Sequence, residues 1–232
     1  MGRTGMGAAL RARAGRRCVL CLERPATAGL CEPCRADLPW LPGARCPRCA
    51  LPTAGGTICG NCLRDPPAFD GIAAVVSYAF PVDALIGRLK YAGELMLAPV
   101  LGDLLGTVAR LDPVPDLVLP IPLASDRLRH RGFNQTLEIA RALPPHLAQR
   151  VTPHLLVRRH DSPPQASLPL DARAANVRNA FACAGDLAGR SVAIVDDVMT
   201  TGATLDAAAK VLRRAGASSV RGWIVARTLR DP

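Results

Sequence analysis

The sequence predicts an α/β fold, in which a parallel sheet covered by helices follows a small metal-binding region. Two observations support this prediction: paired cysteines fill the first third of the chain, and short apolar strands alternate with helical segments after it. The chain has 232 residues, enough for one ordinary domain and a small one. Hydrophobic residues make up 49% of the chain and aromatic residues 3%, so aliphatic side chains must build the core.

Eight of the nine cysteines form four C-x-x-C pairs that make an internal repeat. The pairs are CVLC (18–21), CEPC (31–34), CPRC (46–49) and CGNC (59–62), and a shift of 28 residues (46 minus 18) places the first two pairs on the last two. Each pair puts two sulfurs on one tight turn, so two pairs provide the four thiolates of a tetrahedral zinc site. A disulfide framework and redox C-x-x-C chemistry are the alternatives, and four pairs in register favour zinc over both.

We therefore predict two zinc ions, which are structural because four thiolates leave no coordination position open. The self-sufficient repeat favours sequential ligation, in which each unit of the repeat holds one ion, while cross-braced ligation stays open. The predicted ligands are Cys18, Cys21, Cys31, Cys34, Cys46, Cys49, Cys59 and Cys62. The ninth cysteine, Cys183, belongs to no C-x-x-C pair, and we interpret it as a small apolar residue.

The ends and the charge of the chain limit where it can act. The N-terminal residues MGRTGMGAALRARAGRR lack an apolar h-region, so we expect a loose tail over residues 1–17, no secretory signal and a cytoplasmic location. No apolar run approaches the 18 residues of a membrane span, so none is expected. The formal net charge is +10, but two four-thiolate zinc sites of about −2 each would lower it to roughly +6. Charge alone therefore does not identify a nucleic-acid-binding protein.

The rest of the chain alternates between strand and helix patterns after a proline-containing linker at 63–70. We expect a zinc-ribbon domain over 18–65 and an α/β domain over 70–232. Segment 161–181 is polar and loop-like. Predicted strands lie at 71–80, 115–123, 151–159, 191–197 and 219–228, and predicted helices at 81–93, 97–110, 132–143 and 204–216.

Two adjacent carboxylates, Asp196 and Asp197, end the apolar strand at 191–197. In parallel sheets, ligands bind at the carboxyl ends of the strands. An unpaired charge at such a place does not stabilise the fold, so we expect these carboxylates to bind a ligand. The next residues carry hydroxyls and little bulk, and then a helix begins with its free N–H groups facing the same place. A ligand with a phosphate at one end and vicinal hydroxyls at the other fits this arrangement. The loop residues are Thr200, Thr201, Gly202, Ala203 and Thr204.

Residues 192–204, VAIVDDVMTTGAT, resemble the 5-phosphoribosyl-1-pyrophosphate (PRPP) loop of type I phosphoribosyltransferases. Over about residues 18 to 229, the C-x-x-C repeat, LKYAGE and PIPLASDRLRHRGFNQ also resemble the ComF family. The resemblance implies a type I phosphoribosyltransferase fold preceded by a tandem zinc ribbon. It also implies Mg2+-dependent transfer of a phosphoribosyl group from PRPP to an unidentified acceptor, and a link to natural transformation, the uptake of single-stranded DNA.

By position, the resemblance implies that Asp196 and Asp197 accept hydrogen bonds from the ribose hydroxyls and that Thr200 to Thr204 hold the 5′-phosphate. The pyrophosphate side and a mobile flap over 161–181 would supply Lys90, Arg127, Arg129, Arg131, Arg173, Asn176 and Arg178. Residues 127–132 could equally form a solvated basic turn, and Lys90–Tyr91 could simply end a helix. A non-catalytic role also stays open: an accessory protein that binds single-stranded DNA or the DNA-uptake machinery and uses the fold as a scaffold or nucleotide sensor.

Overall fold

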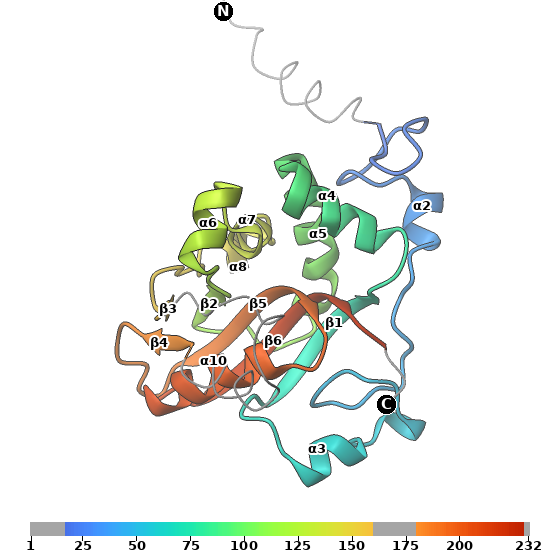
Figure 1. Ribbon diagram of the computed structural model, residues 1–232. Helices are drawn as coiled ribbons and strands as arrows, with labels where there is room; N and C mark the ends of the chain where they lie inside the picture. The colour runs from blue at the N-terminus through green and yellow to red at the C-terminus, as the bar shows by residue number, and fades with distance from the viewer. Residues whose placement is uncertain (1–16, 160–179, 230–232) are drawn as a thin grey trace, which may run out of the picture.

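The computed structural model describes residues 17–159 and 180–229, and it centres on a four-stranded parallel sheet in the order β1-β6-β5-β2 (Figure 1). The register places Asp196 beside Ile224, and Leu117 beside Val192. A parallel bridge between Val118 and Val151 lies on the far side of β2. The strands are β1 (Gly71–Ser77), β2 (Leu117–Pro120), β5 (Ser191–Met199) and β6 (Ser219–Arg227).

Helices cover both faces of the sheet because its strands are apolar on both sides. Ala193 and Val195 pack into one core, with α4 (Val82–Ala92), α5 (Ala98–Ala109) and α7 (Gln135–Arg141). Val192 and Ile194 pack into the other, with α10 (Ala203–Arg214). Short helices complete the chain: α2 (Glu32–Ala36), η1 (Ala54–Gly56), α3 (Gly60–Arg64), η2 (Leu95–Leu97), α6 (Ser125–Arg131) and α8 (Pro145–Ala148).

The predicted α/β class is confirmed, and three local features differ from the sequence prediction. Residues 125–131, to which the sequence analysis assigned no element and for which a basic turn was one alternative, form the helix α6. Gly132 adopts φ +82° and ends this helix with its N–H on the carbonyl of Leu128. The strand predicted at 151–159 contributes only the Val151 bridge to the parallel sheet. Its second half is β3 (Leu156–Arg158), which pairs antiparallel with an unpredicted strand, β4 (Phe181–Cys183). Three-residue strands are too short to show an alternating pattern.

Each half of the cysteine repeat packs on a different face of the sheet. Cys18 and Cys31 lie in the core that contains α4 and α5, whereas Cys46 and Cys62 lie in the core that contains α10. The segment between them runs along the free edge of β1, where Ser77 N–H donates to the carbonyl of Pro39 over 2.8 Å. The two ribbons therefore share hydrophobic cores with the sheet.

No helix within residues 17–159 and 180–229 is long and apolar enough to cross a lipid bilayer.

Candidate functional site

The site lies where neighbouring strands of the sheet send their connections in opposite directions. The chain leaves β5 through α10 to reach β6, while it leaves β2 through α6 and α7 toward Val151 on the opposite side. A crevice opens at the carboxyl ends of strands at such a point. Asp196 and Asp197 lie on β5 at this crevice, and the strand continues two residues beyond them to Met199. Both carboxylates are nearly buried, with exposed fractions of 9% and 3%.

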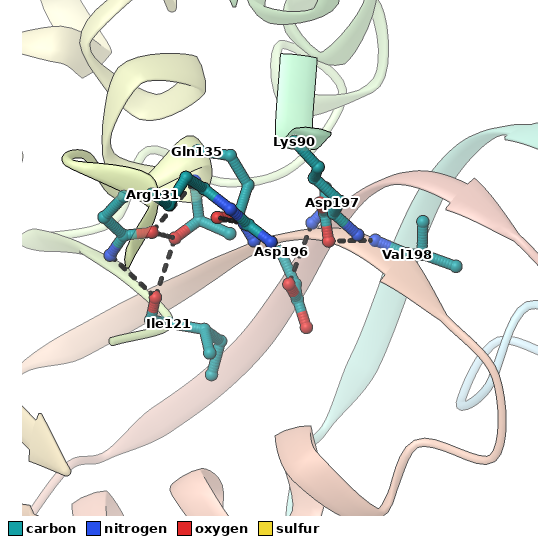
Figure 2. Close-up of polar contacts among 9 residues, drawn as sticks. Lys90, Ile121, Arg131, Gln135, Asp196, Asp197 and Val198 are labelled. Carbon is teal, nitrogen blue, oxygen red and sulfur yellow. Dashed lines mark hydrogen bonds and ion pairs between the residues drawn. The ribbon is translucent and has the colours of Figure 1, made fainter. Parts of the chain in front are cut away.

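A lysine from another element meets the second aspartate (Figure 2). Lys90 Nζ, near the end of α4, lies 2.6 Å from Oδ2 of Asp197. The backbone holds one further oxygen of each carboxylate, since Asp197 N–H donates to Asp196 Oδ1 and Val198 N–H donates to Asp197 Oδ1, both over 2.9 Å. The sequence suggested Lys90 only by resemblance, and the structure gives it this partner. Asp196, in contrast to Asp197, lies beside the loop that follows β5.

Burial raises the pKa of Asp196 well above its usual value of 3.8, and the neighbouring charge of Asp197 adds to the rise. Between pH 4 and the raised pKa, the folded protein holds a proton on Asp196 that the unfolded chain has lost. The unfolded state then binds fewer protons, so the free energy of unfolding falls as pH rises through this interval. Asp196 therefore costs the fold stability at neutral and higher pH.

We expect Asp196→Asn, which cannot ionise, to raise the melting temperature at pH 8. A gain of 1 kcal/mol corresponds to about 2–4 °C in a chain of this size. The gain should shrink toward pH 4, because the aspartate is then protonated in both states. Calorimetric melts across this pH range measure the effect, with the exposed Asp186→Asn as the control. A melting temperature below that of the unsubstituted protein at pH 8 would contradict the burial argument.

The loop after β5 brings the predicted small and hydroxyl residues together around Asp196. Gly202 adopts φ +88°, and a Cβ there would lie 2.5 Å from Met199 Cε, so the turn requires glycine. The Thr201 hydroxyl accepts the N–H of Ala203 over 3.4 Å at the start of α10. One small hollow is lined by Asp196 and by the loop residues Thr200, Thr201, Gly202, Ala203 and Thr204. Carboxylate, hydroxyls and helix N–H groups therefore face one volume.

Across the crevice, α6 and α7 supply cations and amides. Arg131 donates to Gln135 Oε1 over 2.5 Å, and Figure 2 shows Arg131 and Lys90 reaching toward the carboxylate pair. Asn134 caps α7, and its side-chain amide donates to the carbonyl of Ile121 over 3.0 Å. This bond ties α7 to the end of β2.

The remaining predicted cations lie in different places. Lys90, Arg127 and Arg131 line one cleft of about 830 Å3 between α4 and α6. Arg129 is not among the residues that line this cleft, and it forms an ion pair with Asp126. The flap candidates Arg173, Asn176 and Arg178 lie outside the described residues.

Arg227, at the end of β6, is a residue that the sequence analysis missed. Its side chain is 3% exposed, and Nε donates to the carbonyl of Cys49 over 3.0 Å. Its Nη1 donates to the carbonyl of Met199 over 3.0 Å and to that of Thr200. Burial lowers the pKa of Arg227, and the thiolate charges around Cys49 oppose this. One guanidinium therefore joins the second zinc ribbon to the start of the loop.

The eight paired cysteines form two groups with the geometry of zinc sites. Cys18, Cys21, Cys31 and Cys34 form one group and Cys46, Cys49, Cys59 and Cys62 the other, with all sulfurs of a group within 4.8 Å of one another. Sulfurs about 2.3 Å from a tetrahedral zinc lie about 3.8 Å apart. The observed separations are 3.8 Å between Cys21 and Cys31 and 3.6 Å between Cys49 and Cys59. This grouping of the cysteines is the one that sequential ligation predicts.

Backbone N–H groups favour the thiolate form of the first cysteine in each group. Burial disfavours ionisation of Cys18, but the backbone N–H groups of Cys21, Cys31 and Leu20 outweigh it and lower its pKa to about 6. The corresponding residue of the second group, Cys46, has its pKa lowered to about 7 in the same way. Each group therefore has one thiol that ionises readily for zinc. The contact with Cys31 raises the pKa of Cys34 to about 12, and burial raises the pKa of Cys62, so a zinc ion would have to displace the protons of these thiols. Cys183 lies outside both groups and is half-buried.

Comparison with known proteins agrees with this architecture. The double zinc ribbon domain model matches residues 10–63, and the phosphoribosyl transferase domain model matches residues 139–230. DNA utilization protein YhgH of Escherichia coli O6:H1 is 35% identical over 191 residues, which are 79% of this chain and 84% of that protein. Competence protein F of Haemophilus influenzae is 30% identical over 209 residues, 86% of this chain and 90% of that protein. The chain belongs to the ComF family.

Within the ComF family, the similarity extends to distant members. Competence protein ComFC of Bacillus subtilis is 28% identical over 213 residues, 86% of this chain and 84% of that protein. The predicted family and the predicted combination of a double zinc ribbon with a phosphoribosyltransferase fold are confirmed.

Proposed function

We propose that this ComF protein binds PRPP together with Mg2+ and transfers its phosphoribosyl group to an acceptor. The observation that supports this most directly is the shared volume of Asp196, the loop 200–204 and the N-terminus of α10. Carboxylates accept hydrogen bonds from a ribose diol, and backbone N–H groups at a helix start hold a phosphate. Mg2+ would arrive with the substrate, on its pyrophosphate.

In the proposed reaction, the bond between the ribose C1′ and the pyrophosphate oxygen breaks and a bond from C1′ to the acceptor forms. Positive charge develops on the ribose ring at the transition state, while the leaving pyrophosphate carries negative charge. The chain contributes by positioning the ribose on Asp196 and Asp197 and by stabilising the leaving group with Arg127, Arg131 and Lys90. No residue is assigned as a general base.

Calorimetric titration with Mg2+ and PRPP tests the binding step. Each lost hydrogen bond to a charged group costs about 1.5–3 kcal/mol, so the double variant Asp196→Asn/Asp197→Asn should bind at least about 100-fold more weakly. Asp186→Asn, an exposed carboxylate outside the site, should bind as the unsubstituted protein does. Equal affinity in the double variant would remove the carboxylate pair from the proposal.

Turnover needs a separate experiment, because a phosphoribosyltransferase fold can also bind nucleotides without catalysis. Purine and pyrimidine bases are incubated with PRPP, Mg2+ and the protein, and pyrophosphate release is measured. Release that depends on one base, and that the double aspartate variant loses, supports transfer. Tight binding of PRPP with no base-dependent release supports a sensor instead.

The second candidate function is binding of single-stranded DNA or of DNA-uptake proteins, with the fold as a scaffold. Two relatives carry the names DNA utilization protein and competence protein, and α6 presents Arg127 and His130 to solvent. For either function we propose a cytoplasmic location, where unpaired thiols stay reduced and can bind zinc.

A further inference from the structure

Arg227, at the end of β6, lies between the second zinc ribbon (residues 46–62) and the loop that starts at Thr200. In the sheet it pairs with Met199, the last residue of β5. Its guanidinium donates to the carbonyl of Cys49 over 3.0 Å on one side, and to the carbonyls of Met199 and Thr200 on the other. One buried residue, 3% exposed, therefore holds the backbone of both segments.

The hydrogen bond to Thr200 fixes the direction of the next N–H group. The peptide between Thr200 and Thr201 is trans, and a trans peptide directs its C=O and its N–H to opposite sides. Because the Thr200 carbonyl faces Arg227, the Thr201 N–H faces away from it. No acceptor among the described residues takes this N–H, and Thr201 also lines the hollow beside Asp196. Arg227 thus orients a free donor of the loop that would hold the phosphate.

A cavity of about 620 Å3 lies behind the loop, between the second ribbon and α10. Cys49 and Cys62 line it on the ribbon side, and Thr201 and Gly202 line it on the loop side. Close packing normally fixes a backbone in one position, and a cavity of this size removes such packing from this side of the loop. The loop therefore depends on the hydrogen bonds of Arg227, which also lines the cavity.

The two ribbons are attached to different elements of the sheet domain. The chain that follows the second ribbon reaches α10, where Ala68 N–H donates to Asp206 Oδ1 over 2.8 Å. The first ribbon lies in the core that contains α4 and α5, and Arg35 beside its last cysteine forms an ion pair with Asp103 of α5 over 2.5 Å. The first ribbon therefore provides an internal control, because it has the same kind of metal site on other elements.

We propose that the second zinc ribbon, when it holds its metal, keeps the loop 200–204 in its phosphate-binding form, with Arg227 as the positioning residue between them. Zinc fixes the turn that carries Cys49, and the Cys49 carbonyl in turn orients the guanidinium. Four thiolates around one Zn2+ carry a net charge of about −2, which also attracts the guanidinium. A phosphate bound in the loop would keep Arg227 on Cys49 and so stabilise the metal site, because coupling between two sites is reciprocal. The proposal rests on the proposed function and makes its ligand affinity depend on the metal of one ribbon.

Cysteine alkylation tests this coupling without any ligand. The full-length zinc-loaded protein is treated with a zinc chelator and iodoacetamide, and peptide mass spectrometry follows the two cysteine groups separately. We expect Arg227→Met to speed alkylation of the second group at least about tenfold, because this group loses a charged hydrogen bond to its backbone. The first group, which lies in the other core, should change by less than about threefold.

Two further variants separate the coupling from a general loss of stability. Leu104→Ala removes a buried side chain from the core that contains the first group, so it destabilises the fold without preferentially exposing the second group. Gly202→Ala strains the loop, because the new Cβ would lie 2.5 Å from Met199 Cε. By reciprocity, it should speed alkylation of the second group at least about threefold. Equal acceleration of both groups by Arg227→Met, or an unchanged second group in Gly202→Ala, would overturn the proposal.

Calorimetric titration with Mg2+ and PRPP tests the effect on the loop. Cys34→Ser and Cys62→Ser remove the cysteine at the same place in the repeat from the first and the second ribbon. At a temperature at which near-ultraviolet circular dichroism shows both variants folded, we expect Cys62→Ser to bind PRPP at least about tenfold more weakly than Cys34→Ser. Arg227→Lys, which keeps the charge but has fewer donors, should bind more tightly than Arg227→Met and more weakly than the unsubstituted protein.

The two experiments distinguish failure of this proposal from failure of the phosphoribosyl function. Equal PRPP affinity in the two cysteine variants would contradict the proposal, because the metal of the second ribbon would then have no effect on the loop. Absence of PRPP binding by the unsubstituted protein would overturn the phosphoribosyl function, and alkylation would then decide the coupling alone. Selective alkylation of the second group in Arg227→Met and Gly202→Ala supports the coupling, and equal alkylation of both groups excludes it.

Discussion

Removal of both zinc ions is expected to destabilise the whole chain, including the sheet. Each cysteine group belongs to one of the two cores that hold the helices on the sheet, and zinc supplies much of the folding energy of such small ribbons. Without zinc, no ion holds the four thiols of each group together. Each core then loses part of the zinc ribbon that packs against it. We expect chelation to lower the melting temperature by at least about 10 °C, since 1 kcal/mol corresponds to about 2–4 °C in a chain of this size.

Calorimetry with a zinc chelator measures this loss, and re-addition of zinc should restore the melting temperature. Near-ultraviolet circular dichroism reports on Trp223, which is buried in the core of the sheet, so its signal should disappear in the same transition. Cys183→Ser is the matched control, because this cysteine belongs to neither group. Native mass spectrometry should find two metals per chain. A sheet that melts unchanged after chelation, or a single bound metal, would contradict the structure.

Arg227→Met is expected to lower the free energy of unfolding by about 3 kcal/mol or more. The substitution keeps much of the side-chain volume but removes a buried guanidinium that donates to the carbonyls of Cys49, Met199, Thr200 and Thr228. Buried acceptors left without donors each cost about 1–3 kcal/mol. The loss of a positive charge beside the thiolates of the second ribbon adds to this cost.

Urea unfolding of matched variants measures the effect. Arg227→Lys keeps the charge but not the planar fork of donors, so it should recover only part of the stability. Arg214→Met removes an arginine from the surface of α10 and should cost less than about 0.5 kcal/mol. Equal losses for Arg227→Met and Arg214→Met would show that the buried contacts contribute no stability.

The features that the sequence predicted are those with a local pattern. Doubled C-x-x-C spacing predicted both metal sites and their pairing, because two pairs on neighbouring turns suffice for one ion. The strands at β1, β5 and β6 are apolar runs bounded by helices, and Asp196 and Asp197 stand out because charge interrupts such a run. The arrangement of the loop 200–204 likewise follows from adjacent residues.

The features that the sequence missed depend on contacts between distant segments. Arg227 sits in an ordinary apolar strand, and only the fold brings it to Cys49, which lies 178 residues away. The resemblance suggested Lys90 as a site residue, but its contact with Asp197 forms only once α4 has packed on the sheet. The placement of the two ribbons on opposite faces follows from the segment along the edge of β1, which carries no motif. Tertiary packing decides such contacts, and no local pattern encodes them.

The most direct measurement is a crystal structure of the zinc-loaded protein with Mg2+ and PRPP. The proposed function predicts the ribose 2′- and 3′-hydroxyls on Asp196 and Asp197, the 5′-phosphate within Thr200–Thr204 at the start of α10, and the pyrophosphate facing Arg131. Crystals soaked to saturation in which this loop binds no phosphate, or in which PRPP occupies another part of the surface, would contradict it.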